Sequence, residues 1–291
     1  MTDEKKFSGW KRTYISLLNA ATVICIIVGI MINVGGFMGS GIFNSIFRST
    51  VNRESASVSD EADRAGSSVM DMESFNTLKG EIAIGNVVIE YGDGYGYQFE
   101  GFPKGEEPVG KIKDGTLKLE QKVKNNRLGS VNELKSRFSS AKIIVTVPEG
   151  ETLDVKLKLS VGAFEVRDFT FDDLKIDADM GSVKIEDCTA DKIEVDADMG
   201  SVEINSATFD EGKIDAAMGG IELSDVVFDD ADIKADMGGI TVSGEFNKLE
   251  AKCSMGGIDV TTDSQDARMD LSAELGGITV NGKSEGRGYK N

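Results

Sequence analysis

The sequence repeats itself in KIDADMGSVKI (residues 175–185), EVDADMGSVEI (residues 194–204) and KIDAAMGGIEL (residues 213–223). The repeat extends beyond these segments, because a glycine preceded by Met, Val or Leu recurs every 18 to 20 residues between residues 161 and 276. Self-similarity at a period of this length is typical of solenoid proteins, in which equivalent units stack on one another. The period therefore indicates the fold class before any single element is assigned.

Apolar residues in the aligned units occupy columns two positions apart, two before the Met-Gly step and two after it. The first column is Ile176, Val195, Ile214 and Ile233, and the second is Ala178, Ala197, Ala216 and Ala235. The columns after the step begin at Val183 and Ile185. Alternating apolar residues, most of them β-branched, predict strands with one buried face. The residues between them are charged or hydroxylated, so the other face is expected to contact water.

The alternation of buried and exposed residues shifts by one position between Ala178 and Val183. A corner with a flexible glycine accommodates such a shift. Each unit is therefore predicted to be one coil: a strand, a glycine corner, a second strand and a return of roughly six to eight residues. The return often brings in an aromatic residue, as at Phe171, Phe209 and Phe228. We predict an all-β fold, a parallel β-solenoid with coils of about 19 residues, regular over residues 161–283.

The regions on either side of the regular repeats have weaker patterns. Residues 74–160 are predicted to form an irregular β-region of the same solenoid, with a long loop at residues 91–108. Residues 284–291 form a polar, glycine-rich tail that is expected to discourage end-to-end stacking of solenoids.

An apolar segment precedes the β-region. Residues 13–47 carry no charge, and residues 15–34 form an almost continuous apolar run, which is the length of a membrane-spanning helix. The run follows four basic residues, Lys5, Lys6, Lys11 and Arg12. The positive-inside rule therefore places residues 1–12 in the cytoplasm and the rest of the chain outside. A cleaved signal peptide is the alternative, but the long run and the lack of an A-x-A site favour an anchor.

Residues 48–73 are rich in Ser, Asp and Glu and contain few large apolar side chains. Such a segment buries too little surface to offset its ordering entropy, so we predict a flexible linker. The chain is thus predicted to be a single-pass protein that contacts the membrane through residues 15–34 and displays its C-terminal domain at the cell surface.

Several motifs resemble the bacterial putative-adhesin family of β-strand-repeat domains. They are the glycine-led strand near residue 80, the segment VTVPEGETL (residues 145–153) and the units VGAFEV, MGSVKI, MGSVEI and MGGIEL. The resemblance covers roughly residues 75–282 and implies a right-handed β-solenoid-like fold on the cell envelope, often behind an N-terminal membrane helix. It also implies a role in adhesion, and it supplies no catalytic residue.

The composition excludes several functions. The chain has no histidine, so Ser-His-Asp catalysis and His-ligated zinc are excluded. Residues 161–291 contain 30 acidic and 12 basic residues, so the whole net charge of −18 belongs to the repeats. Such an acidic surface argues against nucleic acid, whose binding requires clustered Lys and Arg.

Two columns of aspartates lie on the predicted wet face, and equivalent residues of a parallel stack are about 4.8 Å apart. One interpretation is that Ca²⁺ or another hard cation bridges these carboxylates. The other is a solvated acidic face screened by water, salt and interspersed lysines. The spacing matches neither a calcium β-roll nor an EF-hand. The candidate metal ligands are Asp177, Asp179, Asp196, Asp198, Asp215 and Asp236. No other cofactor is expected.

The sulfur-containing residues of the repeats allow two interpretations. The methionines before the glycines could bind a soft metal, but their inward phase favours filling of the core at each corner. They are Met180, Met199, Met218, Met237 and Met255. Cys188 and Cys253 are three coils apart, too far for a disulfide, so we predict buried free thiols.

These features predict a membrane-anchored, extracytoplasmic binding or scaffold protein without catalysis, whose partner is an envelope protein or a glycan. One alternative is an envelope module stabilised by divalent cations. Another is a carbohydrate-active solenoid enzyme that uses paired carboxylates as acid and base. The repetition of the aspartates favours a non-catalytic role, because an active site is a unique constellation in a pocket.

Overall fold

A computed structural model describes residues 64–69, 71–123 and 140–291. These residues form 21 strands that pair in one continuous sheet, which confirms the predicted all-β solenoid. Within the described ranges, no helix is long and apolar enough to cross a bilayer. The predicted cytoplasmic segment, membrane helix and first part of the linker lie outside the described residues.

The irregular N-terminal part contains β1 (Arg64–Val69), β2 (Thr77–Ile82), β3 (Asn86–Gly92), β4 (Gly96–Pro103), β5 (Val109–Lys113), β6 (Thr116–Glu120), β7 (Lys142–Pro148) and β8 (Leu153–Leu159). The regular coils contain β9 (Phe164–Arg167), β10 (Thr170–Met180), β11 (Val183–Glu186), β12 (Thr189–Met199), β13 (Val202–Asn205), β14 (Thr208–Met218), β15 (Ile221–Met237), β16 (Ile240–Met255), β17 (Ile258–Thr261), β18 (Arg268–Leu275) and β19 (Ile278–Val280). The chain ends with β20 (Lys283–Gly286) and β21 (Gly288–Lys290).

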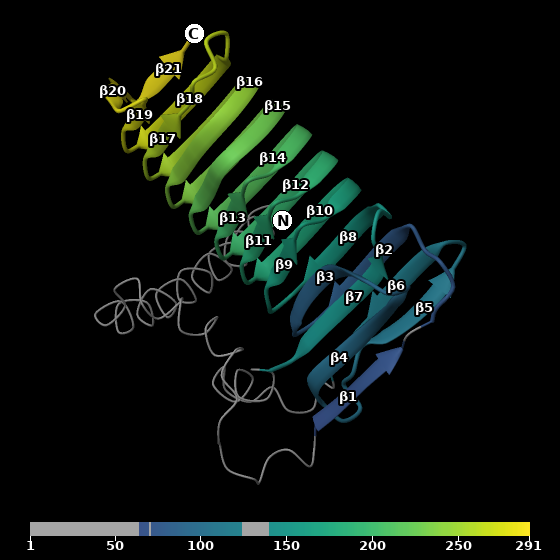
Figure 1. Cartoon of the computed structure of the whole chain (residues 1–291). Helices are drawn as coiled ribbons and strands as arrows, with labels where there is room; N and C mark the ends of the chain where they lie inside the picture. Colours follow the sequence, from purple (N-terminus) through teal and green to yellow (C-terminus); the bar gives the residue numbers. More distant parts are fainter. Residues whose placement is uncertain (1–63, 70, 124–139) are drawn as a thin grey trace, which may run out of the picture. The chain divides into compact units, whose positions relative to one another are not determined.

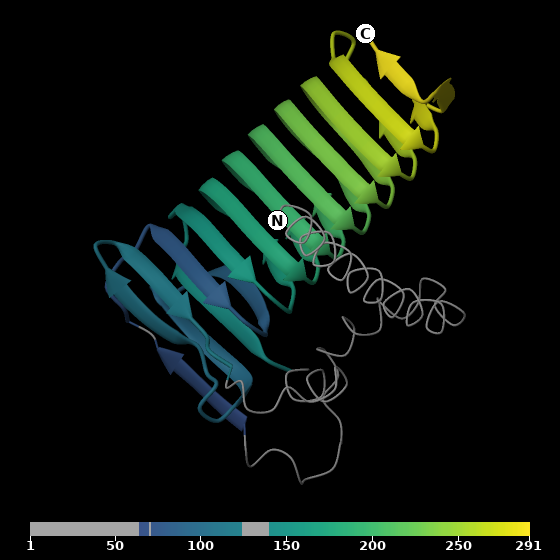
Figure 2. The same ribbon diagram turned by 180° about the vertical axis from the view of Figure 1, so that it is seen from behind.

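Each regular coil contributes a long and a short stretch of strand to two opposite walls. The long stretches pair in parallel from β8 through β10, β12, β14, β15 and β16 to β18. Short strands such as β9, β11 and β13 pair in the same way on the other wall. Figures 1 and 2 show the coils following one another in chain order to the C-terminal end. The pairing aligns equivalent positions, for example Ala178 with Ala197, which confirms the 19-residue coil.

The core lies between the two walls and contains the predicted apolar columns. Ile176 and Val183 are at most 1% exposed, as are their equivalents Val195 and Val202 in the next coil. The predicted aromatic residues are also buried: Phe171, Phe209, Phe228 and Phe246. Burying an aliphatic or aromatic side chain of this size stabilises a fold by about 1.5–3 kcal/mol. The core is thus built from rows of side chains that run along the stack.

The return between coils is shorter than predicted. β9 ends at Arg167 and β10 already begins at Thr170, so most of the predicted return belongs to the long strand. The chain reverses at a single left-handed residue, Asp168 with φ 52°, and Asp187 and Ser206 occupy the same place in later coils with φ 53°. Short polar residues tolerate this conformation better than most, which explains the tight corner.

The N-terminal region differs from the prediction in two places. Residues 96–103 form β4, which pairs antiparallel with β7, where a long loop was expected. Tyr97 and Phe102 of β4 are buried, so this strand adds to the core. β1 lies within the predicted linker and pairs antiparallel with β4. Backbone pairing at a sheet edge needs no apolar side chains, so composition alone did not reveal β1.

The polar tail also forms strands. β20 pairs antiparallel with β19, and β21 pairs antiparallel with β18. The last coil therefore has its backbone groups paired by the tail, in the manner of the capping units that protect the ends of solenoids.

The glycine corner is the tightest contact between coils. The N–H of Gly181 donates to the Met199 carbonyl oxygen at 2.9 Å, and the corner glycines of later coils repeat this bond. A Cβ on Gly181 would lie 1.7 Å from the carbonyl oxygen of Gly162 in the preceding coil. A Cβ on Gly238 would lie 1.9 Å from that of Gly219, and the φ of Gly238 is 149°. Only glycine fits, for both steric and conformational reasons.

This contact yields a prediction with an adjacent control. Gly238→Ala is expected to lower the free energy of unfolding by at least about 2 kcal/mol, because backbone of two coils must separate. Gly239→Ala places its Cβ 3.7 Å from the nearest atom, the Gly257 carbonyl oxygen, and is expected to have a much smaller effect. Urea unfolding of both variants of the full chain measures the difference. Equal destabilisation by the two substitutions would contradict the steric explanation.

Candidate functional site

Three rows of charged side chains cross the outer surface of the long-strand wall, and together we call them the charged face. Each row contains one residue per strand, aligned by the parallel register. The first row is Asp173, Lys192, Glu211, Asp230, Lys248 and Arg268. The second is Lys175, Glu194, Lys213, Asp232, Glu250 and Asp270. The third is Lys158, Asp177, Asp196, Asp215, Lys234 and Lys252.

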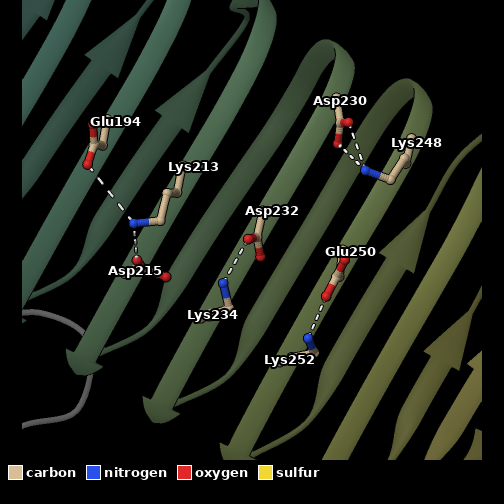
Figure 3. A network of polar contacts seen from close by, with 9 residues as sticks. All are labelled: Glu194, Lys213, Asp215, Asp230, Asp232, Lys234, Lys248, Glu250 and Lys252. Atoms are coloured by element: carbon tan, nitrogen blue, oxygen red, sulfur yellow. Dashed lines mark hydrogen bonds and ion pairs between the residues drawn. The ribbon is translucent and has the colours of Figure 1, made fainter.

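Acidic and basic residues are interspersed within these rows and form ion pairs along and across the strands. Lys213 of β14 lies 3.1 Å from Asp215 on its own strand and 4.0 Å from Glu194 on β12 (Figure 3). Lys248 of β16 reaches back to Asp230 of β15 at 2.7 Å. Exposed pairs of this kind each contribute at most about 1 kcal/mol, so the face is better described as a balanced charge pattern than as a stability element.

The first predicted aspartate column is confirmed as a row by the register, since Asp177 aligns with Asp196 and Asp196 aligns with Asp215. Lysines close this row at both ends. Lys158 contacts Asp177 at 3.0 Å, and Lys234 aligns with Asp215. The like charges are thus confined to three consecutive coils.

The second predicted column lies one residue before the corner methionines. Asp179 contacts Lys158 at 3.3 Å, whereas Asp198 and Asp236 are exposed on later coils. In the part of the chain that the structure describes, no group of three or more Asp, Glu, Cys or His side chains could hold a metal ion. The described carboxylates thus offer no ligand cluster for the cation that was one of the two interpretations of these columns.

Three aspartates are adjacent at the centre of the third row. The pKa of Asp196 is raised, first by burial and then by the neighbouring carboxylates of Asp198, Asp177 and Asp215, while Lys213 opposes the shift. Asp215 meets Lys213 through Oδ2, but its Oδ1 is shielded from solvent without a hydrogen-bond partner. The centre of the face therefore retains excess negative charge.

The corner methionines are not in the core, so the prediction that they fill it was wrong. Met180, Met237 and Met255 are 43%, 40% and 46% exposed. Met180 is the next position in the alternation of inward-facing residues, but the chain turns at the following glycine. Its side chain therefore lies on the outside of the corner. The cysteine prediction is confirmed, because Cys188 and Cys253 are buried free thiols.

The repeat architecture is that of a known protein family. Residues 80–291 match the toastrack family DUF4097. The chain belongs to the toastrack family. Its regular coils and most of its irregular N-terminal β-region lie within the matched range. None of the curated proteins matches this toastrack chain significantly.

Solved structures similar to this chain include proteins described as putative adhesins. A putative adhesin from Bacteroides fragilis has a TM-score of 0.57 and 19% identity, over 76% of this chain and 97% of the other. A putative adhesin from Parabacteroides merdae has a TM-score of 0.43 and 11% identity, over 76% and 97%. The first similarity supports the solenoid fold of this toastrack protein.

Sequence reasoning found the aspartate columns and the lysines interspersed among them, but it did not place the lysines and glutamates in rows of their own. Lys175, Glu194 and Lys213 occupy one row, and this could have been found by aligning the lysine positions of the repeats in the same way as the aspartates. The exposure of the methionines could not be found from the columns, because it depends on where the chain turns within the coil.

The charge imbalance at Asp196 predicts a pH-dependent stability effect. The pKa of Asp196 in the folded state lies above its ordinary value of 3.8, so the folded state binds this proton more tightly than the unfolded state does. The contribution of Asp196 to the free energy of unfolding therefore falls as the pH rises through this region. Asp196→Asn is therefore expected to raise the free energy of unfolding near neutral pH, by less than about 1 kcal/mol, and to have no such benefit near the ordinary pKa.

Urea unfolding at a series of pH values measures this effect. Asp215→Asn is the matched control, because it removes a charge from the same row but also loses the ion pair with Lys213. The control is expected to show a smaller gain or a loss. If Asp196→Asn left the free energy of unfolding at neutral pH unchanged, or lowered it, the prediction that repulsion at Asp196 destabilises the fold would be wrong.

Proposed function

We propose that this toastrack protein is a membrane-anchored, extracytoplasmic binding or scaffold protein without catalytic activity, and that the charged face is its interaction surface. The observation that carries the proposal is the repetition of the outward positions over successive coils. Lys175, Glu194 and Lys213 occupy equivalent positions in three coils, so the surface is extended and presents charged groups at a regular spacing. Such a surface suits contact with an extended or repetitive partner, such as an envelope protein or a glycan.

The arrangement of perturbed carboxylates supports a role without catalysis. Among the described acidic residues, Asp196 and Glu165 have a raised pKa, and burial is the largest cause in both. Asp196 belongs to β12 in the long-strand wall, whereas Glu165 belongs to β9 in the short-strand wall. Their side chains point outward from opposite walls, whereas a glycosidase places its two carboxylates on either side of one bond. A carbohydrate-active enzyme is therefore the weaker alternative.

The names of related structures support adhesion as the biological setting. The similar protein from Bacteroides fragilis is described as a putative adhesin, and a solved structure from Clostridium sporogenes is described as a putative cell adhesion protein. The first shares this fold at 19% identity, so the adhesive role comes to this chain as part of the proposal.

The membrane location in the proposal comes from the sequence. Residues 15–34 have the length and hydropathy of a spanning helix, and the basic residues before them favour a cytoplasmic N-terminus. The segment at residues 48–63 would then connect the anchor to the solenoid, which begins with β1 on the outer side.

Protease treatment of intact cells tests the proposal. Trypsin added outside cells that produce the full chain, with any outer membrane permeabilised, is expected to cleave after Arg48 or Arg53. A fragment containing the solenoid should be released, while a tag placed before residue 12 should stay protected. A cytoplasmic protein serves as the lysis control. Protection of everything beyond residue 49 until the cells are lysed would reverse the topology and overturn the proposed function.

A further inference from the structure

An exposed row of thioether side chains runs along the glycine corners of the solenoid. The register aligns five methionines of five successive coils, and we call them the methionine row: Met180, Met199, Met218, Met237 and Met255. The first and the last two are 40–46% exposed, and the middle two are partly exposed. Leu275 continues the row in the next coil and is 61% exposed.

The methionine row has no evident packing task. The walls of the core are filled by the columns that contain Ala178 and Val183, both of which are buried. Contact between coils at the corner is made by the glycines and by their hydrogen bonds to the methionine carbonyl oxygens, which any residue could supply. The exposed thioethers of the row are therefore used neither by the core nor by the hydrogen bonds of the corner.

The spacing of the row suits a soft metal ion. Equivalent atoms in neighbouring parallel strands repeat about every 4.8 Å, so an ion midway between two equivalent sulfurs would lie about 2.4 Å from each. This is close to the zinc–thiolate bond length of about 2.3 Å, which sets the scale of bonds between metal ions and sulfur. Methionine is unbranched and adapts its rotamers easily, so neighbouring thioethers can adjust to a shared ion.

The surroundings of the row favour a monovalent soft cation. Asp179, Asp198 and Asp236 each directly precede a methionine of the row in the sequence, so the corners carry negative charge. Imidazole, the commonest nitrogen ligand of metals in proteins, is absent, because the sequence contains no histidine. Cys188 and Cys253 are buried, and burial raises the pKa of the Cys188 thiol to about 11, so neither competes as an exposed thiolate. The third cysteine, Cys25, lies outside the described residues, so every protein titrated with silver carries Cys25→Ser. Thioether ligands select Cu(I) among biological metals, and Ag(I) has the same preference.

We infer that the methionine row binds soft monovalent metal ions, Cu(I) or Ag(I), each shared between the thioethers of neighbouring coils. This goes beyond the proposed binding or scaffold function and does not depend on it. Because the donors are exposed and one row offers several adjacent pairs, the row would hold ions at the surface, where they can be captured and released.

Silver ion is the probe of choice, because it undergoes no redox change during the measurement. Titration of the purified full chain with silver nitrate in chloride-free buffer, followed by calorimetry, is expected to show binding by the protein with an intact methionine row. Two double variants, each retaining three methionines of the row, then test whether neighbours share the ion. Leucine is the replacement in both, because Leu275 shows that the position accepts it.

Met199→Leu with Met237→Leu leaves no two methionines in neighbouring coils, and it is expected to weaken silver binding by at least about tenfold. Met180→Leu with Met255→Leu leaves Met199, Met218 and Met237 adjacent and is expected to retain tight binding. Circular dichroism of both variants checks that the solenoid is folded. Equal silver affinity in the two variants, or no binding by the chain with an intact methionine row, would overturn the inference.

Discussion

Successive coils approach so closely at the glycine corner that the carbonyl oxygen of one coil occupies the place where a side chain of the next would begin. For Gly200, an added Cβ would lie 1.6 Å from the Gly181 carbonyl oxygen. The same corner is joined by a hydrogen bond from each glycine N–H to the next coil. Since this geometry recurs in every regular coil, each coil must place its glycine at the same point. A difference in coil length falls instead where the short stretch of strand passes into the long one, as between Leu223 and Val226. The period of the sequence is thus a consequence of a backbone contact.

The stacking that follows from this contact turns each sequence position into a row. Inside the solenoid, rows such as Ile176 with Val195 and Ala178 with Ala197 make a continuous core. Outside, the same register would place like charges about 4.8 Å apart if a position were always acidic. The chain limits this repulsion by alternating Lys with Asp and Glu along and across the rows. A net charge of −18 is therefore compatible with a regular stack, although burial and the neighbouring carboxylates raise the pKa of Asp196.

The two surfaces that remain available for function differ in chemistry. The charged face is broad and presents paired ions, which is suited to recognition of another extended polymer. The methionine row is a narrow apolar ridge on the outer side of the corner, where Met180 and Met255 are more than 40% exposed. Both are built from rows with one residue per coil, so either would bind its ligand through contacts repeated along the solenoid axis. The capping strands β20 and β21 occupy the end of the stack and leave its sides free.

The sequence by itself determined the all-β class, the coil period, the buried columns and the free thiols, because periodic apolar residues such as Ile176 and Val183 have only one way to be buried together. It also located the aspartates that form the third row. Only the tertiary structure decided that β1 and β4 join the sheet, because antiparallel edge pairing depends on backbone groups and leaves no periodic pattern. The exposure of Met180 was likewise decided by the tertiary structure, since a side chain with inward phase reaches solvent when the chain turns at the next residue. Local alternation specifies which face of a strand is buried, but the path of the backbone through space specifies where that face ends.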